Sequence, residues 1–148
     1  MRVLEDEQAT LKVGRELAAM LRIGDKIALT GTLGAGKTTL ARGILEGLGF
    51  DEEVPSPTFA IVQQYEPPET IMPIAHVDLY RIDDPEEIQE LGLEDTIAVG
   101  AMIVEWPDRL PDIFWNDALK ITLEITEEGN RRLTWSTGDA WKDRWPQT

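Results

Sequence analysis

The sequence of 148 residues contains no cysteine and a single histidine, His76. Disulfide bonds are therefore excluded, and so is a zinc site built from thiolates or several histidines. Any bound metal must be held by oxygen ligands. No apolar stretch approaches the length of a membrane span, about 18 residues, and residues 1–7 lack the apolar core of a signal peptide. We therefore expect a soluble, cytoplasmic protein with no membrane contact.

Basic residues are scarce, with 14 Lys and Arg against 28 Asp and Glu, and the formal net charge is −14. A negative surface repels the phosphates of nucleic acids, so direct binding of RNA or DNA is disfavoured. The acidic runs, such as Asp83-Asp84-Pro85-Glu86-Glu87, are typical of solvated surface. A basic protein partner is the alternative interpretation.

The length fits one ordinary domain, so we expect residues 1–148 to form a single domain. Apolar residues at helical spacing predict an amphipathic helix over residues 7–22, with Asp6 as its cap, and a second helix along residues 40–48 that ends near Gly49. Short apolar runs predict strands at residues 26–30, from 59 onward, at 74–77 and at 101–104.

The last third of the chain has a different pattern. Apolar and polar residues alternate over residues 119–125 and again around Leu133 and Trp135, on either side of a turn at Glu128-Gly129-Asn130. This alternation predicts a half-exposed antiparallel hairpin. Together the elements predict an α/β fold of the P-loop NTPase-like type. Its mixed sheet has a parallel core and antiparallel hairpin strands toward an edge, with helices packed on the sheet.

The segment Gly31-Thr32-Leu33-Gly34-Ala35-Gly36-Lys37-Thr38 has the glycine, lysine and hydroxyl spacing of a phosphate-binding loop. Glycines permit the positive φ values that turn successive backbone N–H groups toward phosphate oxygens. Lys37 would place its charge on the β- and γ-phosphates, and the Thr38 hydroxyl can ligate Mg²⁺. The sequence therefore predicts a site for ATP and Mg²⁺.

A nucleotide site of this kind needs a carboxylate near the metal, at the end of a neighbouring strand. Asp78 follows the predicted strand at 74–77, and Glu105 follows the one at 101–104. One could hold Mg²⁺ while the other orients or deprotonates the attacking water, and the sequence leaves this division open.

Further candidates lie around these motifs. Thr58, in Ser56-Pro57-Thr58, could sense the γ-phosphate, and His76 could orient Asp78 from the same strand face. A structural role for His76 is the alternative. Trp106 adjoins Glu105, and Thr10 on the first helix is a positional candidate for adenine contact. The five tryptophans are otherwise expected in or near the core, and an arginine that completes catalysis could come from a partner.

Four motifs, in their order and spacing, resemble those of the bacterial TsaE (YjeE-type) proteins. They cover roughly residues 10 to 110 and are Gly31-Thr32-Leu33-Gly34-Ala35-Gly36-Lys37-Thr38-Thr39, Ser56-Pro57-Thr58-Phe59, His76-Val77-Asp78-Leu79-Tyr80-Arg81 and Val104-Glu105-Trp106-Pro107. The resemblance implies an ATPase that acts in forming N6-threonylcarbamoyladenosine at position 37 of tRNA, alongside TsaD and TsaB. It also implies that acyl transfer occurs on TsaD, with nucleotide turnover here regulating or resetting the complex. The acidic composition makes us expect contact with tRNA only through the complex, and a catalytic arginine supplied by a partner would make turnover slow in the isolated chain.

The resemblance also implies roles for single residues. The expected catalytic residues are Lys37, Asp78, Glu105 and Thr58, and the expected metal ligands are Thr38, Glu105 and Asp78. The expected nucleotide contacts are Gly31, Gly34, Ala35, Gly36, Lys37, Thr38, Thr39, Trp106 and Thr10. Thr32 departs from the family, which commonly has aspartate there, and this change affects water positioning and the rate of hydrolysis rather than the phosphate cradle.

Three other functions share the loop. A small kinase would need an arginine-rich lid, which the sequence does not show, and a GTPase would carry an Asn-Lys-x-Asp or Thr-Lys-x-Asp motif, which is absent. A module that binds ATP without hydrolysing it has the same motifs, so the sequence leaves this alternative open.

Overall fold

The computed structural model describes residues 1–32, 34–52, 62–82 and 84–145. Its strands are β1 (Arg2–Leu4), β2 (Lys26–Gly31), β3 (Val62–Tyr65), β4 (Ile74–Asp78), β5 (Ala101–Glu105), β6 (Leu119–Ile125) and β7 (Arg131–Thr137). Its helices are α1 (Glu7–Ala18), α2 (Lys37–Gly47), α3 (Pro85–Glu90) and α4 (Leu93–Val99), with short 3₁₀ segments η1 (Pro107–Arg109) and η2 (Asp112–Trp115).

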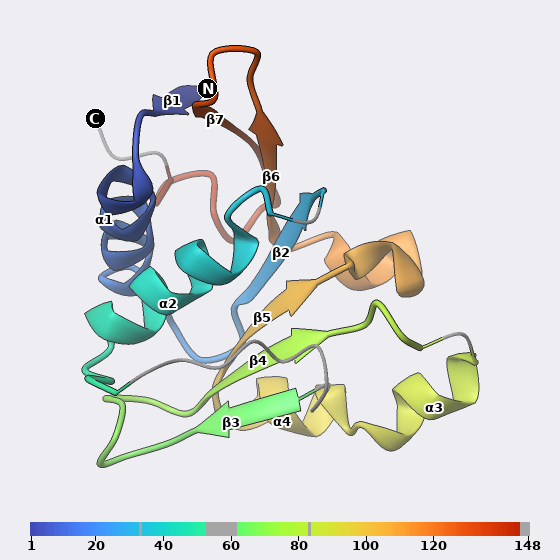
Figure 1. Ribbon diagram of the computed structural model, residues 1–148. Coiled ribbons are helices and arrows are strands. Elements are labelled where there is room, and N and C mark those ends of the chain that lie inside the picture. Colours follow the sequence, from blue (N-terminus) through green and yellow to red (C-terminus); the bar gives the residue numbers. More distant parts are fainter. Residues whose placement is uncertain (33, 53–61, 83, 146–148) are drawn as a thin grey trace.

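All these strands belong to one mixed sheet in the order β1-β7-β6-β2-β5-β4-β3 (Figure 1). The central strands β6, β2, β5 and β4 are parallel, while β7 and β1 on one side and β3 on the other run antiparallel to their neighbours. The predicted α/β class is therefore confirmed. The alternating pattern indicated antiparallel strands only at the C-terminal edge, because β1 and β3 are too short to show alternation.

The hairpin of β6 and β7 is also confirmed, and its first strand completes the core. Leu119, Ile121 and Leu123 of β6 are fully buried, and β6 pairs in parallel with β2. The strand predicted from residue 59 onward begins at Val62 in the structure; residues 59–61 lie outside the described residues. The loop strand β2 thus lies between β5 and β6, at the centre of the sheet.

Helices α1 and α2 cover one face of the sheet, and their backbones touch. A Cβ added at Gly14 of α1 would lie 2.6 Å from the Leu40 carbonyl oxygen, and one added at Gly43 of α2 would lie 2.5 Å from the Leu11 carbonyl oxygen. Any side chain at these positions would force the helices apart. The glycines therefore set the close contact that holds α2, and with it the loop before α2, against the sheet.

Helix α1 begins as predicted and ends earlier than predicted. The Asp6 side chain accepts a hydrogen bond from the Ala9 N–H at 2.8 Å, which caps the helix. The predicted end at residue 22 is wrong, because the helix stops at Ala18. The Asp25 carboxylate accepts from the Arg22 N–H at 2.7 Å and folds the chain into a turn, while Leu21 stays half-buried and so continues the apolar pattern beyond the helix.

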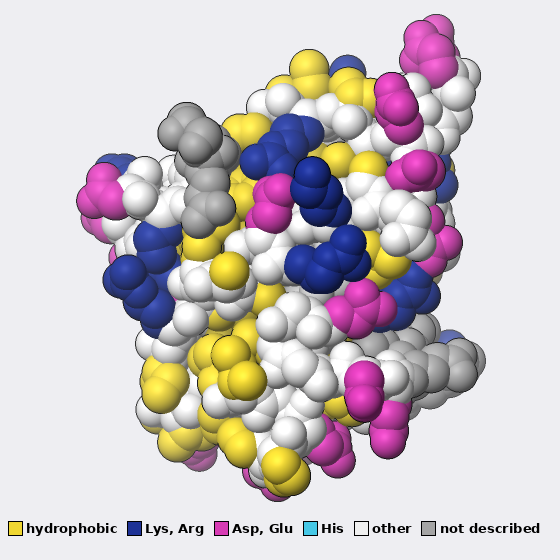
Figure 2. All heavy atoms as spheres, turned by 90° about the vertical axis from the view of Figure 1, so that its left-hand side faces the viewer, with side chains coloured by type: hydrophobic (Ala, Val, Ile, Leu, Met, Phe, Trp, Pro, Cys, Tyr) yellow, Lys and Arg dark blue, Asp and Glu magenta, His cyan; other side chains and the backbone are white. Residues whose placement is uncertain are grey.

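Several basic side chains gather on the face that Figure 2 shows, which is the left-hand side of Figure 1, where α1 lies. Ion pairs join Arg2 to Glu16 and Arg15 to Glu46, and a further pair joins Arg42 to Glu7. These contacts link β1, α1 and α2 across the surface. The basic side chains that make them are partly neutralised by neighbouring glutamates.

The second face is covered over β4 and β5 by α3, α4 and the η segments, around Val77, Met102 and Trp115. Trp141 and Trp145, beyond β7, are buried against the core under α1. The expectation that most tryptophans pack in or near the core is confirmed. None of the helices in the described ranges is both long and apolar enough to cross a membrane.

Candidate functional site

The predicted phosphate loop joins the carboxyl end of β2 to the N-terminus of α2, and all its residues except Leu33 are described. Gly36 is the N-cap of α2 at φ 104°, a left-handed conformation that favours glycine, and no side chain of a described residue caps this helix. By contrast, Asp6 caps α1 and Asp84 caps α3. The first N–H groups of α2 thus lack a side-chain cap, which is the arrangement of an anion site at a helix N-terminus.

Lys37 lies inside this loop and is 5% exposed. Its Nζ donates to the Gly31 carbonyl oxygen at 2.8 Å and lies 4.0 Å from the centre of the Trp106 ring. Burial lowers the pKa of Lys37 below its ordinary value of 10.5, while the nearby carboxylates of Glu105, Asp78 and Asp108 act in the opposite direction. A dianionic or trianionic ligand would raise the pKa of Lys37 again, because it would supply a counter-charge inside the loop.

Asp78 and Glu105 end the adjacent parallel strands β4 and β5 and face each other in register. Both side chains are almost completely buried, at 5% and 4% exposure. Leu29 of β2 is in register with Glu105 and packs in the core under α1 and α2, so the two acids lie on the same sheet face as α2. The structure therefore brings both predicted carboxylates to the side of the sheet that carries the loop.

The two acids have different partners. The Glu105 Oε2 lies 2.7 Å from the Nε2 of His76, whereas the Asp78 Oδ1 accepts from the Tyr80 N–H at 2.9 Å. His76 shares the strand face of Asp78, as expected, but its hydrogen bond goes across to β5. The interpretation that His76 orients Asp78 therefore gives way to a contact with Glu105.

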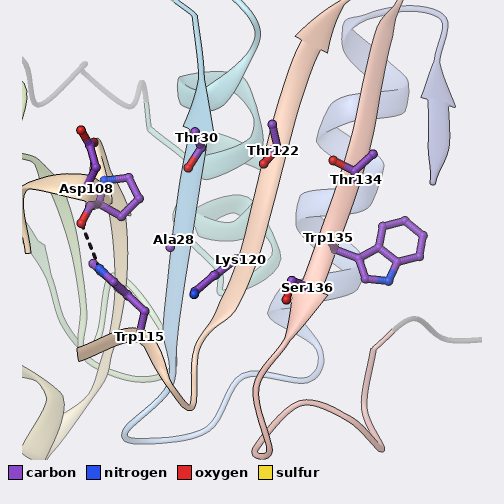
Figure 3. A pocket seen from close by; sticks show the side chains of 10 residues that line it. Ala28, Thr30, Asp108, Trp115, Lys120, Thr122, Thr134, Trp135 and Ser136 are labelled. Atoms are coloured by element: carbon purple, nitrogen blue, oxygen red, sulfur yellow. Dashed lines mark hydrogen bonds between the residues drawn. The ribbon is translucent and has the colours of Figure 1, made fainter. Parts of the chain in front are cut away.

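Trp106 follows Glu105 in a left-handed conformation, with φ 63°, which is uncommon for a residue other than glycine. Its ring packs 4.8 Å from that of Tyr80, centre to centre. The following segment is fixed by Trp115, whose Nε1 donates to the Pro107 carbonyl oxygen at 2.9 Å, drawn as a dashed line in Figure 3. These contacts hold the aromatic face of Trp106 against Lys37.

A cavity of about 260 Å³ opens beside the loop. It is lined by residues of three segments, Leu4, Glu5, Asp6, Glu7 and Thr10 near the start of α1, Gly34, Gly36 and Thr39 of the loop and α2, and Gly129 and Arg131 of the hairpin. Thr10 is among these lining residues but is only 2% exposed, and its contact with adenine stays a prediction.

Arg131 is a residue that sequence reasoning missed. Its guanidinium donates to the Gly34 carbonyl oxygen at 3.2 Å and to the Gly129 carbonyl oxygen at 3.1 Å. The hairpin therefore brings a cation to the loop from 97 positions further along the chain. The sequence carries no signal for this contact, because it depends on how the hairpin curves over the sheet edge.

The remaining predicted residues lie around the same loop. Ala35 is buried and its N–H donates to the Thr32 carbonyl oxygen at 3.1 Å, and Thr38 and Thr39 are half-buried in the first turn of α2. Thr58 lies outside the described residues. Across the described ranges, no group of three or more His, Asp or Glu side chains could hold a metal ion without further ligands. Mg²⁺ in nucleotide sites usually has only one or two protein carboxylates, with phosphates and waters as the other ligands.

A second cavity, of about 360 Å³, lies on the sheet face opposite α1 and α2. Thr30, Thr122 and Thr134 form a row there across β2, β6 and β7 (Figure 3). Its described lining includes no residue from the first turn of α1, α2, α3 or α4, and none of Lys37, Asp78 or Glu105. The loop at the other face is therefore the better candidate for an anionic ligand.

The central parallel strands, the glycine-rich loop before α2 and the two strand-end acids have the arrangement of a P-loop NTPase-like α/β protein. The family model described as "Threonylcarbamoyl adenosine biosynthesis protein TsaE" matches residues 4–133. The chain belongs to this TsaE family, whose role is in the biosynthesis of threonylcarbamoyladenosine in tRNA.

Individual relatives agree with this assignment. The TsaE protein of Synechocystis sp. is 44% identical over 115 residues, which cover 74% of this chain and 71% of that protein. The TsaE protein of Bacillus subtilis is 34% identical over 130 residues, covering 87% and 80%. The crystal structure of Bacillus subtilis YdiB superposes with a TM-score of 0.74 at 28% identity and covers 92% of this chain and 83% of that chain.

Proposed function

We propose that the chain binds ATP with Mg²⁺ at the loop of residues 31–38 and hydrolyses it, as the nucleotide-driven subunit of the threonylcarbamoyladenosine machinery together with TsaD and TsaB. The observation that carries the proposal is the position of Lys37. It lies between the uncapped N-terminus of α2 and two buried carboxylates on the same sheet face. The site fits a magnesium nucleotide, because it combines phosphate donors with the carboxylates that such a complex needs.

Each residue has a defined task in this proposal. The N–H groups of Gly34 to Thr38 would surround the phosphates, and Lys37 would leave the Gly31 carbonyl oxygen to pair with the β- and γ-phosphates. Thr38 and one of the two acids would hold Mg²⁺, which neutralises the charge that develops on the transferred phosphoryl group. The second acid would orient the attacking water. Thr58 remains a candidate that senses the γ-phosphate.

The cavity beside the loop would take the base and ribose. Thr39, half-buried, would offer its hydroxyl there, and the planar guanidinium of Arg131 can stack on an adenine ring or pair with the α-phosphate. Arg131 already touches the loop through Gly34. It therefore supplies a cation from within the chain, and a cation that reaches the γ-phosphate would come from a partner.

Family membership supports the participation of TsaD and TsaB, and the net charge of −14 supports an indirect contact with tRNA. The test is to measure phosphate release from ATP by the wild type and by Glu105→Gln, with and without TsaD and TsaB. We expect slow release alone, stimulation by the two proteins, and a loss of about 100-fold in Glu105→Gln. If ATP binds but no phosphate is released above the level of buffer in the presence of both proteins, the chain would instead be a module that binds ATP without hydrolysing it.

A further inference from the structure

The single histidine of the chain lies under the site rather than at its surface. His76 is completely buried on β4, and its Nε2 lies 2.7 Å from the Glu105 Oε2. On β5 the residue in register with His76 is Ile103, part of the apolar core, and on β3 it is the half-buried Gln63. An aliphatic residue could therefore occupy this strand position at a lower cost of desolvation than an imidazole that is paired with a carboxylate.

The hydrogen bond fixes the direction of donation. An ionised carboxylate can only accept, so the His76 Nε2 must carry the proton and donate to Glu105. The other ring nitrogen, Nδ1, is buried and has no hydrogen-bond partner among the described residues. A proton on Nδ1 would be a buried donor without an acceptor, so the hydrogen-bonding geometry places the donated proton on Nε2.

This donation leaves one oxygen of Glu105 for the site. Oε2 is occupied by His76, while the charge of Glu105 acts on Lys37 inside the loop. Without this hydrogen bond, the Glu105 carboxylate can rotate about its side-chain bonds and leave the orientation that the site needs. Hydrogen-bond partners of metal-binding groups typically contribute about 10-fold to 100-fold to metal affinity or activity.

We propose that His76 is a positioning residue, whose Nε2–H holds the Glu105 carboxylate in the orientation that the magnesium nucleotide needs. The inference rests on the proposed function, and of its two acids it takes Glu105 as the one that holds Mg²⁺. His76 touches neither substrate nor metal in this scheme. It acts through Glu105, so its effect must vanish when the carboxylate is changed.

The test compares three substitutions at one position. His76→Gln can return an amide N–H near the place of Nε2, His76→Asn is too short to reach it, and His76→Leu keeps the bulk without a donor. Ile103→Val is the matched control, because it lies in the buried interior of the sheet in register with His76 and has no hydrogen-bonding side chain. The measurements are ATP turnover with TsaD and TsaB, Mn²⁺ affinity of the ADP complex by electron paramagnetic resonance, and urea unfolding.

We expect His76→Leu and His76→Asn to weaken Mn²⁺ binding and to lower kcat by about 10-fold or more, with the KM for ATP changed less than about 2-fold. His76→Gln should recover most of both losses, and Ile103→Val should show neither. In a Glu105→Gln background, His76→Leu should weaken Mn²⁺ binding no further.

Equal Mn²⁺ affinity in the wild type, His76→Leu and His76→Asn would overturn the proposal. Equal losses in His76→Gln and His76→Asn would also overturn it, and so would an undiminished effect of His76→Leu in the Glu105→Gln background. If His76→Leu does not fold, the contrast between the Gln and Asn variants still decides. A wild type that binds Mn²⁺ and ADP without turnover would contradict the proposed hydrolysis alone, since the metal affinities still test His76.

Discussion

Arg144 donates two hydrogen bonds to the Asp25 carboxylate, at 2.7 and 2.8 Å, and so connects the C-terminal segment to the turn before β2, the strand that leads into the phosphate loop. Both side chains are largely buried, at 10% and 6% exposure. Arg144 also donates to the Met20 carbonyl oxygen at 2.6 Å and lies over the Trp141 ring. The pair thus closes the end of the sheet opposite the candidate nucleotide site.

Removing one partner of this buried pair should be costly. We expect Asp25→Ala to lower the free energy of unfolding by about 3 kcal/mol, because Arg144 would remain buried without its counter-charge. Urea unfolding followed by tryptophan fluorescence measures the change. The control is Lys142→Ala, which removes an exposed ion pair with Asp139 and should leave the unfolding midpoint unchanged. An Asp25→Ala variant as stable as the control would show that solvent satisfies Arg144.

The contact between α1 and α2 predicts a second loss of stability. In Gly14→Ala the new Cβ would lie 2.6 Å from both the Leu40 carbonyl oxygen and the Ile44 backbone nitrogen, so the helices must separate. We expect a loss of about 2 kcal/mol, although alanine favours helix more than glycine does. Lys12→Ala, on the exposed side of the same helix, is the control. A Gly14→Ala variant that is more stable than wild type would mean that helix propensity outweighs the clash.

In the absence of nucleotide, Lys37 should lower the free energy of unfolding. Its folded-state pKa is lowered by burial, so the charged form is disfavoured in the folded protein. Stability should therefore rise with pH between that lowered pKa and the unfolded value of 10.5, as the folded state releases its proton first. Lys37→Met lacks this contribution, so its advantage over wild type should shrink across that alkaline range.

The measurement is a series of thermal unfolding curves of both proteins without nucleotide from pH 7 upward, compared as differences. Burial raises the pKa of Tyr65, so its ionisation lowers the stability of both proteins as pH rises above its unfolded value of 10.0, and taking the difference cancels this effect. The same Lys37→Met variant should no longer bind ADP in calorimetry. A difference between the two proteins that does not change with pH would contradict the assignment.

Arg131 should contribute to nucleotide affinity. We expect Arg131→Ala to weaken ADP binding by about 10-fold, the loss typical of one charge-assisted contact, without unfolding the hairpin. The matched control is Arg132→Ala, next in sequence, whose side chain pairs with Glu124 on the exposed surface. Calorimetric titration with ADP compares the two. Equal affinities would place the base or α-phosphate away from the cavity beside the loop.

Much of the fold follows from local pattern. Strands β2, β4 and β5 were predicted to within a residue, because each is a continuous apolar run that stops at a glycine or an acid. The short strand β1 and the helices α3 and α4 were not foreseen. They contain three, six and seven residues, which are too few to show a hydrophobic periodicity. Such short elements are stabilised by packing against the rest of the fold rather than by their own sequence.

The candidate site likewise has residues that the sequence predicts and residues that it does not. The loop and both acids could be located from the sequence, since their chemistry is written in contiguous residues at strand ends. The partners of His76 and Arg131 could not. His76 meets a carboxylate 29 positions away through the register of two strands, and Arg131 reaches the loop through the course of a hairpin. Such contacts depend on the order of the strands in the sheet, and the hydrophobic periodicity of a single segment does not determine that order.

The place of β2 in the sheet also has a consequence for how the protein is made. The strand that carries the loop is flanked by β5 and β6, and β6 ends at Ile125. A nascent chain that has not yet released these residues exposes one edge of β2, with its hydrogen-bonding groups unpaired. The nucleotide site can therefore be completed only after β6 has been synthesised, and a fragment that stops before residue 119 should aggregate rather than bind nucleotide.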